Sequence, residues 1–310
     1  MVLLLLIVIP LICAGLIVFN PREQAKYIAA GGSLVSVVFG VVALMAFDWG
    51  RGNVDQMLVN IEWVPALGLN LALGVDSVSL LLIALTLLLG PICVIGSFTA
   101  VVENQKTFYA WLLILQSAMV GVFCARDLVL FYICFEFTLV PMYVLIAMFG
   151  STNRRKASTK FFLYTFTGSV IALAGFAYIA WQHSVFTGEW SFNMAALGET
   201  ARALSASQQG WVLLALMAGF AVKVPLFPVH TWLPLAHTEA PTAGSVILAG
   251  VLLKLGTYGV YKFALPFAPV AMLEYAPFMA ILAIIGILYA GLICWVQTDI
   301  KKLVAYSSVS

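Results

Sequence analysis

Nine apolar runs, each long enough to cross a membrane as a helix, constrain this chain more than any other feature. A spanning helix needs about 20 apolar residues. The runs lie near 1–19, 28–47, 77–101, 108–125, 127–149, 157–181, 211–233, 242–263 and 276–296, and a tenth begins near Leu303. Only 9% of the residues are charged, whereas soluble domains carry about 25%. The sequence therefore predicts an all-α, polytopic transmembrane helix bundle embedded in a lipid bilayer.

The basic residues favour one orientation in the membrane. Loops on the inner side of a membrane carry an excess of Lys and Arg. With the N-terminus outside, the inner loops hold Arg22, Lys26, Lys106, Arg154, Arg155, Lys156, Lys160, Lys301 and Lys302, and the outer loops hold Arg51, Arg126, Arg202 and Lys262. We therefore expect the N-terminus on the outer side. The first run has no basic leader and no clear small-residue cleavage site, so we expect it to be retained as a span.

Several classes of function are excluded by composition and motifs. The net charge of +2 is too small for a nucleic-acid footprint. The five cysteines are scattered among apolar runs without the clustering that disulfide frameworks, zinc sites or iron–sulfur clusters need. We expect no metal site, and the chain has no glycine-rich phosphate loop. The long loops 48–76 and 182–210 contain little charge, so a soluble-substrate enzyme is not expected.

Three charged residues fall at the same depth, near the centres of their spans. Glu136, Lys223 and Lys254 lie one or two residues from the midpoints of 127–149, 211–233 and 242–263. At about 1.5 Å of rise per residue, all three lie within roughly 3 Å of the bilayer centre. A charge at that depth costs at least about 2.5–3.5 kcal/mol and must face a partner or water. We interpret Glu136 and Lys223 as mutual partners; either a fixed ion pair or a proton-carrying pair fits the sequence, and the third charge, Lys254, favours conduction.

A proline cluster follows Lys223. Pro225 and Pro228 each remove a backbone donor inside an apolar run, which predicts a broken helix. Non-helical backbone at membrane depth is tolerated only against protein or a water-lined cavity, although a packed proline kink remains the alternative. His230 lies on a similar helical face seven residues after Lys223, if the helix resumes there. His237 and Glu239 fall in the link to the next span, where His237 is either a proton relay or an interfacial loop residue.

Three stretches carry a family resemblance. They are FEFTLVPMYVLIAMFG at 135–150, KVPLFPVHTWLPLAHTEAPTAGSVILAGVLLKLGTYG at 223–259 and DIKKLVAYSSVS at 299–310. These stretches resemble the antiporter-like membrane subunits of respiratory complex I, most closely the family of subunit M, which is called chain 4 in mitochondria. The likeness extends over most of the chain from about Asp76 onward. HTEAPTAGSV, within the second stretch, distinguishes the chain from the related Mrp-type antiporter subunits.

The resemblance implies a bundle of fourteen helices with two inverted five-helix repeats, the seventh helix being broken. It divides this chain into N-terminal helices (1–101), a first repeat (102–265) and the start of a second repeat (266–310). It implies that Glu136, Lys223 and Lys254 carry protons and that His230 joins the hydrated route between them. His237 and Glu239 are further candidates. Leu235 stands where many relatives carry a charge, so we expect no role there.

The resemblance also implies that this sequence is the N-terminal part of a longer protein. The expected function is proton translocation in a bacterial inner (plasma) membrane, driven by redox chemistry in other subunits of complex I, and the expected partners are the other membrane subunits of that complex. NADH, FMN, iron–sulfur clusters and quinone are expected in those partner subunits, with no cofactor on this chain. The alternatives are a subunit of a cation/proton antiporter, a subunit of an energy-converting hydrogenase, or a non-conducting membrane scaffold.

Overall fold

The computed structural model describes residues 1–310, apart from the side chain of Ala66. Among these residues, eight helical segments are long and apolar enough to cross a membrane, which confirms the predicted polytopic helix bundle. The segments are α1 (Val2–Phe19), η1 with α2 (Arg22–Gln24, Ala25–Ala46), α3 (Ser77–Gly96), α4 (Gln105–Cys124), α5 with α6 (Leu128–Phe137, Leu139–Phe149), α7 (Arg154–Thr187), the segment from α11 to α13 (Thr242–Phe267) and α14 (Pro269–Trp295).

Contacts divide the chain into two units, which are described separately. The first unit comprises Met1–Trp63, Asn70–Ser151 and Ala240–Val251. The second comprises Val64–Leu69, Thr152–Glu239 and Leu252–Ser310. The predicted boundaries at 101/102 and 265/266 concern repeats rather than contacts, and they stay a prediction.

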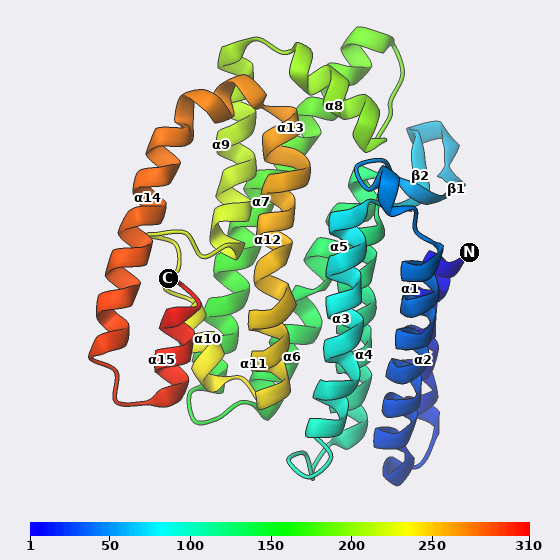
Figure 1. Cartoon of the computed structure of the whole chain (residues 1–310), viewed down its shortest axis with the longest axis vertical. Coiled ribbons are helices and arrows are strands. Elements are labelled where there is room, and N and C mark those ends of the chain that lie inside the picture. Colours follow the sequence, from blue (N-terminus) through cyan, green and yellow to red (C-terminus); the bar gives the residue numbers. More distant parts are fainter. The chain divides into compact units, whose positions relative to one another are not determined.

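In the first unit, α1 to α4 pack side by side (Figure 1). α4 is the central helix, and 83% of the residues in its most apolar 18-residue stretch are buried. Small residues let the helices approach, since a Cβ added at Gly32 would lie 2.6 Å from the Cys13 sulfur. The Ser117 hydroxyl of α4 donates to the Ile7 carbonyl of α1 at 2.7 Å, so a polar side chain of the core is satisfied across the interface.

Both long loops contain regular structure that the hydropathy pattern did not predict. Loop 48–76 forms η2 (Trp49–Arg51) and a two-stranded sheet of β1 (Gln56–Val64) and β2 (Leu69–Val75), joined through η3 (Pro65–Leu67). Loop 182–210 contains the last turn of α7 and a short helix, α8 (Met194–Ala203), which is capped by the Asn193 side chain. The sheet was missed because a window long enough to find spans averages over the period-2 pattern of a strand.

In the second unit, α7 packs along α9 (Ala206–Lys223) through a seam of small residues. A Cβ added at Gly168 of α7 would lie 2.7 Å from the Ala218 carbonyl of α9, and one added at Gly219 would lie 2.7 Å from the Ala172 Cβ. Such close backbone approach is how membrane helices gain packing energy without a hydrophobic driving force. The seam fixes the helix that ends at Lys223.

The predicted break in the seventh span is confirmed. α9 ends at Lys223, residues 224–232 form turns, and α10 (Leu233–Glu239) follows. The break leaves backbone groups to be satisfied, and the Trp232 indole donates to the Val222 carbonyl at 2.9 Å. Pro225 and Pro228, which cannot donate to a helical ladder, lie inside this turn segment.

The next span is irregular around Lys254. α11 (Thr242–Ile247) leads into a π-helical turn, η4 (Leu248–Leu252), followed by α12 (Leu253–Gly259), a second π-helical turn, η5 (Val260–Ala264), and α13 (Leu265–Phe267). π-Helical turns inside α-helices occur frequently at functional sites. α14 and a short helix, α15 (Ile300–Ser307), complete the second unit, and α15 packs against α10.

Candidate functional site

The two predicted lysines belong to elements that touch. Lys223 is the last residue of α9 and only 4% exposed, and Lys254 is half-buried on α12. The elements meet at Gly256, where an added Cβ would lie 2.8 Å from the Val224 nitrogen and 3.0 Å from the Lys223 carbonyl carbon. The structure therefore brings the end of the broken helix against the helix that carries Lys254.

Glu136 belongs to the first unit, on α5, and both of its carboxylate oxygens are buried. The helix is irregular just beyond it, because α5 ends at Phe137 and α6 begins at Leu139. Thr138 joins the two, and its hydroxyl donates to the Phe135 carbonyl at 2.8 Å. Since Glu136 and Lys223 lie in different units, their pairing stays a prediction.

His230 lies in the turn segment after Lys223 and is buried. Its ring stacks on Phe227 at 5.7 Å between centroids and meets the Tyr289 ring edge-on at 5.6 Å. The next residue, Thr231, accepts a 2.8 Å hydrogen bond from the Lys160 ammonium through its carbonyl. The two aromatic rings therefore hold the imidazole, a group that can take up or release a proton near neutral pH, in a non-helical segment.

His237 and Glu239, both on α10, are buried and form a charged cluster with Lys301 of α15. Glu239 accepts a 2.8 Å hydrogen bond from the Asn153 backbone N–H at the start of α7. Burial lowers the pKa of Lys301, whereas the carboxylates of Glu239 and Asp299 act in the opposite direction. Burial also lowers the pKa of His237, and the Lys301 charge lowers it further against a backbone hydrogen bond that raises it.

Sequence reasoning missed Lys301 as a site residue, because it attributed this lysine to the inner basic anchor. The only available signal was its neighbourhood, DIKKLVAYSSVS, which carries part of the family resemblance. Glu239, whose charge raises the pKa of Lys301, lies far away in the chain, so local spacing could not pair the two residues. The cluster lies on the side that the basic residues predict to be inner.

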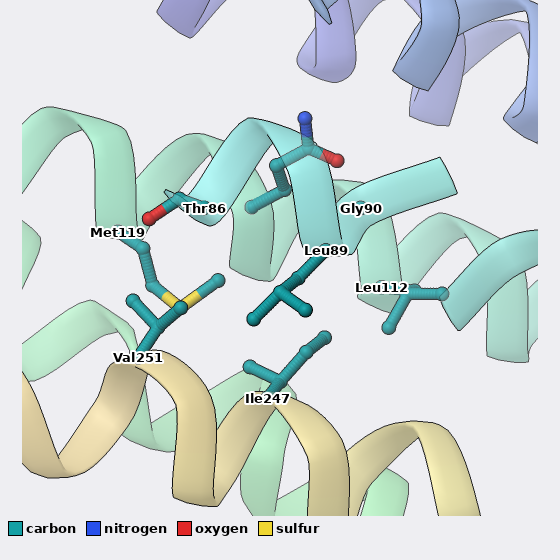
Figure 2. Close-up of a pocket in the computed structure, with 8 residues that line it drawn as sticks. Thr86, Leu89, Gly90, Leu112, Met119, Ile247 and Val251 are labelled. Atoms are coloured by element: carbon teal, nitrogen blue, oxygen red, sulfur yellow. The ribbon is translucent and has the colours of Figure 1, made fainter. Parts of the chain in front are cut away.

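A small pocket in the first unit is separate from these residues. Figure 2 shows it lined mostly by aliphatic side chains, and the full set of lining residues is Thr86, Leu89, Gly90, Leu112, Gln116, Met119, Ile247 and Val251. The Thr86 hydroxyl is engaged with the Leu82 carbonyl at 2.7 Å. Among the residues that the structure describes, none of the predicted site residues lines this pocket, and we assign it no ligand.

Comparison with known sequences decides the family. The profile described as "NADH:quinone oxidoreductase/Mrp antiporter, TM" matches residues 125–310, which include all of the predicted site residues. The chain belongs to this family. Its curated relatives include NADH-ubiquinone oxidoreductase chain 4 of Marchantia polymorpha, 39% identical over 98% of this chain, and NADH-quinone oxidoreductase subunit M of Rickettsia bellii, 38% identical over 94%.

Solved structures agree with this family assignment. Respiratory complex I from Thermus thermophilus contains a chain that superposes with a TM-score of 0.83 at 28% identity, covering 100% of this chain and 62% of that chain. A chain of the Mrp complex from a Dietzia species shares the fold at a TM-score of 0.84 and 21% identity, covering 100% of this chain and 33% of that one. The chain spans 61% of the length of the Marchantia relative and 58% of the Rickettsia bellii relative.

Proposed function

We propose that this chain translocates protons as a membrane subunit of an NADH–quinone oxidoreductase. The observation that carries the proposal is the buried Lys223, which ends α9 where the seventh span breaks, in contact with the helix of Lys254. A broken helix beside an ionisable residue is the arrangement that transporters use at ion sites. A lysine balanced between burial and a nearby carboxylate can load or release a proton when that balance changes.

The proposed path runs from Glu136 and Lys223 towards Lys254. A conformational or electrostatic change in a neighbouring subunit alters the distance between Glu136 and Lys223, and Lys223 then releases its proton. The proton passes through water towards Lys254, with His230 as a relay within the turn segment. The π-helical turns on both sides of α12 support a functional role for this helix, because they distort it around Lys254.

Protons are resupplied from the inner side in this scheme. The buried His237 and Glu239 lie on α10, which directly follows the turn segment of His230. Burial, and to a smaller extent the Lys301 charge, lowers the pKa of His237 and so favours the neutral ring. A neutral imidazole can accept a proton at one nitrogen and donate one from the other. Glu239 and Lys301 supply charges of opposite sign beside it.

The partners follow from the family. We propose that the other membrane subunits of complex I surround this chain in a bacterial inner membrane, with the N-terminus outside. NADH, FMN, iron–sulfur clusters and quinone belong to partner subunits, so this chain contributes to catalysis by coupling rather than by redox chemistry. The names of the relatives support membership in such an oxidoreductase.

Replacement of the two charges in the assembled complex tests the proposal. We expect Lys223→Ala and Glu136→Gln to abolish most proton pumping by inside-out membrane vesicles, whereas Glu136→Asp, which keeps a titratable group, is milder. Pumping is normalised to the amount of assembled complex. The matched controls are Lys156→Ala and Glu274→Gln, which remove the same charges from exposed positions. Full pumping by both Lys223→Ala and Glu136→Gln would refute the scheme.

The rivals predict different outcomes. A scaffold with locked ion pairs predicts that the charge-removing variants reduce assembly while pumping per assembled complex is unchanged. A multisubunit cation/proton antiporter, which the family description also includes, predicts sodium- or potassium-dependent proton exchange without NADH. An energy-converting hydrogenase predicts hydrogenase subunits encoded beside this chain, instead of the quinone-reductase subunits that our proposal expects.

A further inference from the structure

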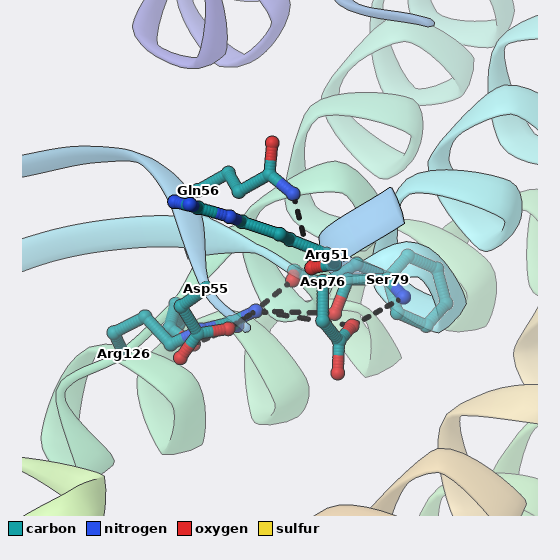
Figure 3. A network of polar contacts seen from close by, with 8 residues as sticks. Arg51, Asp55, Gln56, Asp76, Ser79 and Arg126 are labelled. Atoms are coloured by element: carbon teal, nitrogen blue, oxygen red, sulfur yellow. Dashed lines mark hydrogen bonds and ion pairs between the residues drawn. The ribbon is translucent and has the colours of Figure 1, made fainter. Parts of the chain in front are cut away.

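A charged cluster at the start of α5 takes no part in the proposed proton path (Figure 3). Its centre is Arg126, whose side chain is only 8% exposed and whose Nη2 lies 2.7 Å from the Asp55 carboxylate. The same nitrogen lies 4.0 Å from the Asp76 carboxylate. The Asp55 side chain is 37% exposed, so the buried member of this pair is Arg126. A buried charge is costly unless it is paired and hydrogen-bonded, so Arg126 needs an explanation beyond the general inner–outer distribution of basic residues.

Arg126 connects three separate segments of the first unit. Its Nη2 bonds Asp55, in the loop before β1, and donates to the Ser79 hydroxyl at 3.3 Å at the start of α3. Its Nη1 donates to the Ala125 carbonyl at 2.9 Å, just after α4 ends. Its own backbone N–H donates to the Ala72 carbonyl of β2 at 2.8 Å. The planar guanidinium, with five donors, suits this multiple role better than an ammonium group does.

The next residue fixes the first turn of α5. Asp127 accepts from the backbone N–H groups of Val129 at 2.9 Å and Leu130 at 3.1 Å, which is an N-cap. Its other oxygen accepts from the Asn70 backbone N–H of β2 at 3.3 Å. The sheet also packs closely against Arg126, because a Cβ added at Gly74 would lie 3.1 Å from the Arg126 Cγ. The start of α5 is thus bonded to the sheet and to α3.

This cluster acts on Glu136 through the helix. α5 runs from Leu128 to Phe137 and ends one residue after Glu136. Because a regular helix has a fixed rise per residue, a shift of its N-terminus shifts Glu136 by a similar distance. The contacts that anchor the N-terminus of α5 therefore set the depth of the Glu136 carboxylate. We propose that Arg126 is a positioning residue, whose ion pair with Asp55 and bonds to α3 hold Glu136 at its working depth; the proposal rests on the proposed proton path.

A native thiol reports whether α5 keeps its place. Cys134 lies two residues before Glu136, is half-buried and faces α4, where a Cβ added at Gly121 would lie 2.8 Å from its sulfur. We would measure peptide-resolved labelling of Cys134 by a small thiol reagent, with the half-buried Cys294 of the second unit as internal reference. Pumping per assembled complex is measured on the same membranes, in the whole complex.

Arg126→Met should accelerate Cys134 labelling about tenfold, since it removes the ion pair to Asp55 and the guanidinium hydrogen bonds that anchor α5. It should also lower pumping at least about twofold. Arg126→Lys keeps the charge but loses the planar guanidinium and its several donors, so its labelling rate and its pumping should lie between those of Arg126→Met and the wild type. The matched control is Arg51→Met, in the loop that also carries Asp55. The Arg51 side chain is 80% exposed, so its loss should leave both readouts unchanged. If Arg126→Met does not assemble, Asp55→Asn, which keeps the shape without the charge, replaces it.

The outcomes separate the two proposals. The positioning role is wrong if Arg126→Met leaves Cys134 labelling unchanged, whatever happens to pumping. It is also wrong if labelling rises while pumping stays at the wild-type level and Glu136→Gln abolishes pumping. If Glu136→Gln itself pumps normally, the proton path fails, and the thiol readout alone decides whether Arg126 anchors α5.

Discussion

Gly256 of α12 rests directly on the backbone of Lys223 at the end of α9. A Cβ at this position would lie 3.0 Å from the Lys223 carbonyl carbon and 2.8 Å from the Val224 nitrogen, and backbone cannot move aside as a flexible side chain can. A glycine is therefore required for α12 to reach the broken helix. The contact joins the end of α9, at the buried Lys223, to the helix that carries the half-buried Lys254.

Gly256→Ala should consequently destabilise the protein. Overpacking at a tight site costs about 1–3 kcal/mol of folding stability. Here the group that would be displaced is the backbone at the end of α9, at Lys223 and Val224. We expect a lower melting temperature of the purified complex and weaker pumping per complex. Gly291→Ala on α14 is the control, because its added Cβ would meet nothing within 4 Å. An equal loss in both variants would contradict the packing argument.

The small-residue seam between α7 and α9 should be as sensitive to a larger side chain as Gly256 is. Gly219 lies against Ala172, and its added Cβ would also lie 3.1 Å from the Gly168 carbonyl. Gly219→Val should force the helices apart at a cost of about 1–3 kcal/mol or more, reducing the amount of assembled complex. Gly31→Val on α2, where an added Cβ has open space, should assemble normally. Normal assembly of Gly219→Val would show that α9 is held in place by other contacts.

The N-cap of α5 gives a third test, which is independent of Arg126. Asp127→Ala removes the acceptor of the Val129 and Leu130 N–H groups and should cost about 0.5–2 kcal/mol. Asp127→Asn keeps an acceptor and should cost less. Thermal melting of the purified complex measures the difference, and an identical melting temperature for the two variants would mean that the carboxylate acts by charge rather than as a cap.

The membrane fold could be predicted because its signals are local. Each span shows as a run of apolar residues, and the break after Lys223 shows as Pro225 and Pro228. The π-helical turns around Lys254 could not be predicted, since they depend on packing between helices rather than on composition. The sheet at Gln56–Val75 was hidden because alternation over a few residues disappears in a long hydropathy window.

Only those residues of the candidate site that give a local signal in the sequence could be predicted. Lys223 and Lys254 stand out as charges in apolar runs, so the sequence alone marks them. Lys301 and Arg126 do not stand out, because each lies in or beside a loop where a basic residue is expected. Their roles depend on Glu239 and Asp55, which are distant in sequence and become neighbours only in the fold.

The cluster of His237, Glu239 and Lys301 predicts a pH effect with a definite sign. Burial and the Lys301 charge lower the pKa of His237 from its ordinary value of 6.5, so the folded protein favours the neutral ring. This contribution to stability is present above 6.5 and is lost as the pH falls through the lowered folded pKa. Removing the charge by Lys301→Gln raises the pKa of His237 towards its unfolded value. Less stability is then lost on acidification.

We therefore expect the drop in melting temperature from about pH 7.5 to about pH 5.5 to be smaller in Lys301→Gln than in the wild-type complex. Lys302→Gln is the matched control, because the neighbouring lysine is exposed and should leave the drop unchanged. In a His237→Gln background the effect of Lys301→Gln should disappear, since the titrating ring is absent. If it persists there, another group titrates, and the coupling between Lys301 and His237 is not its cause.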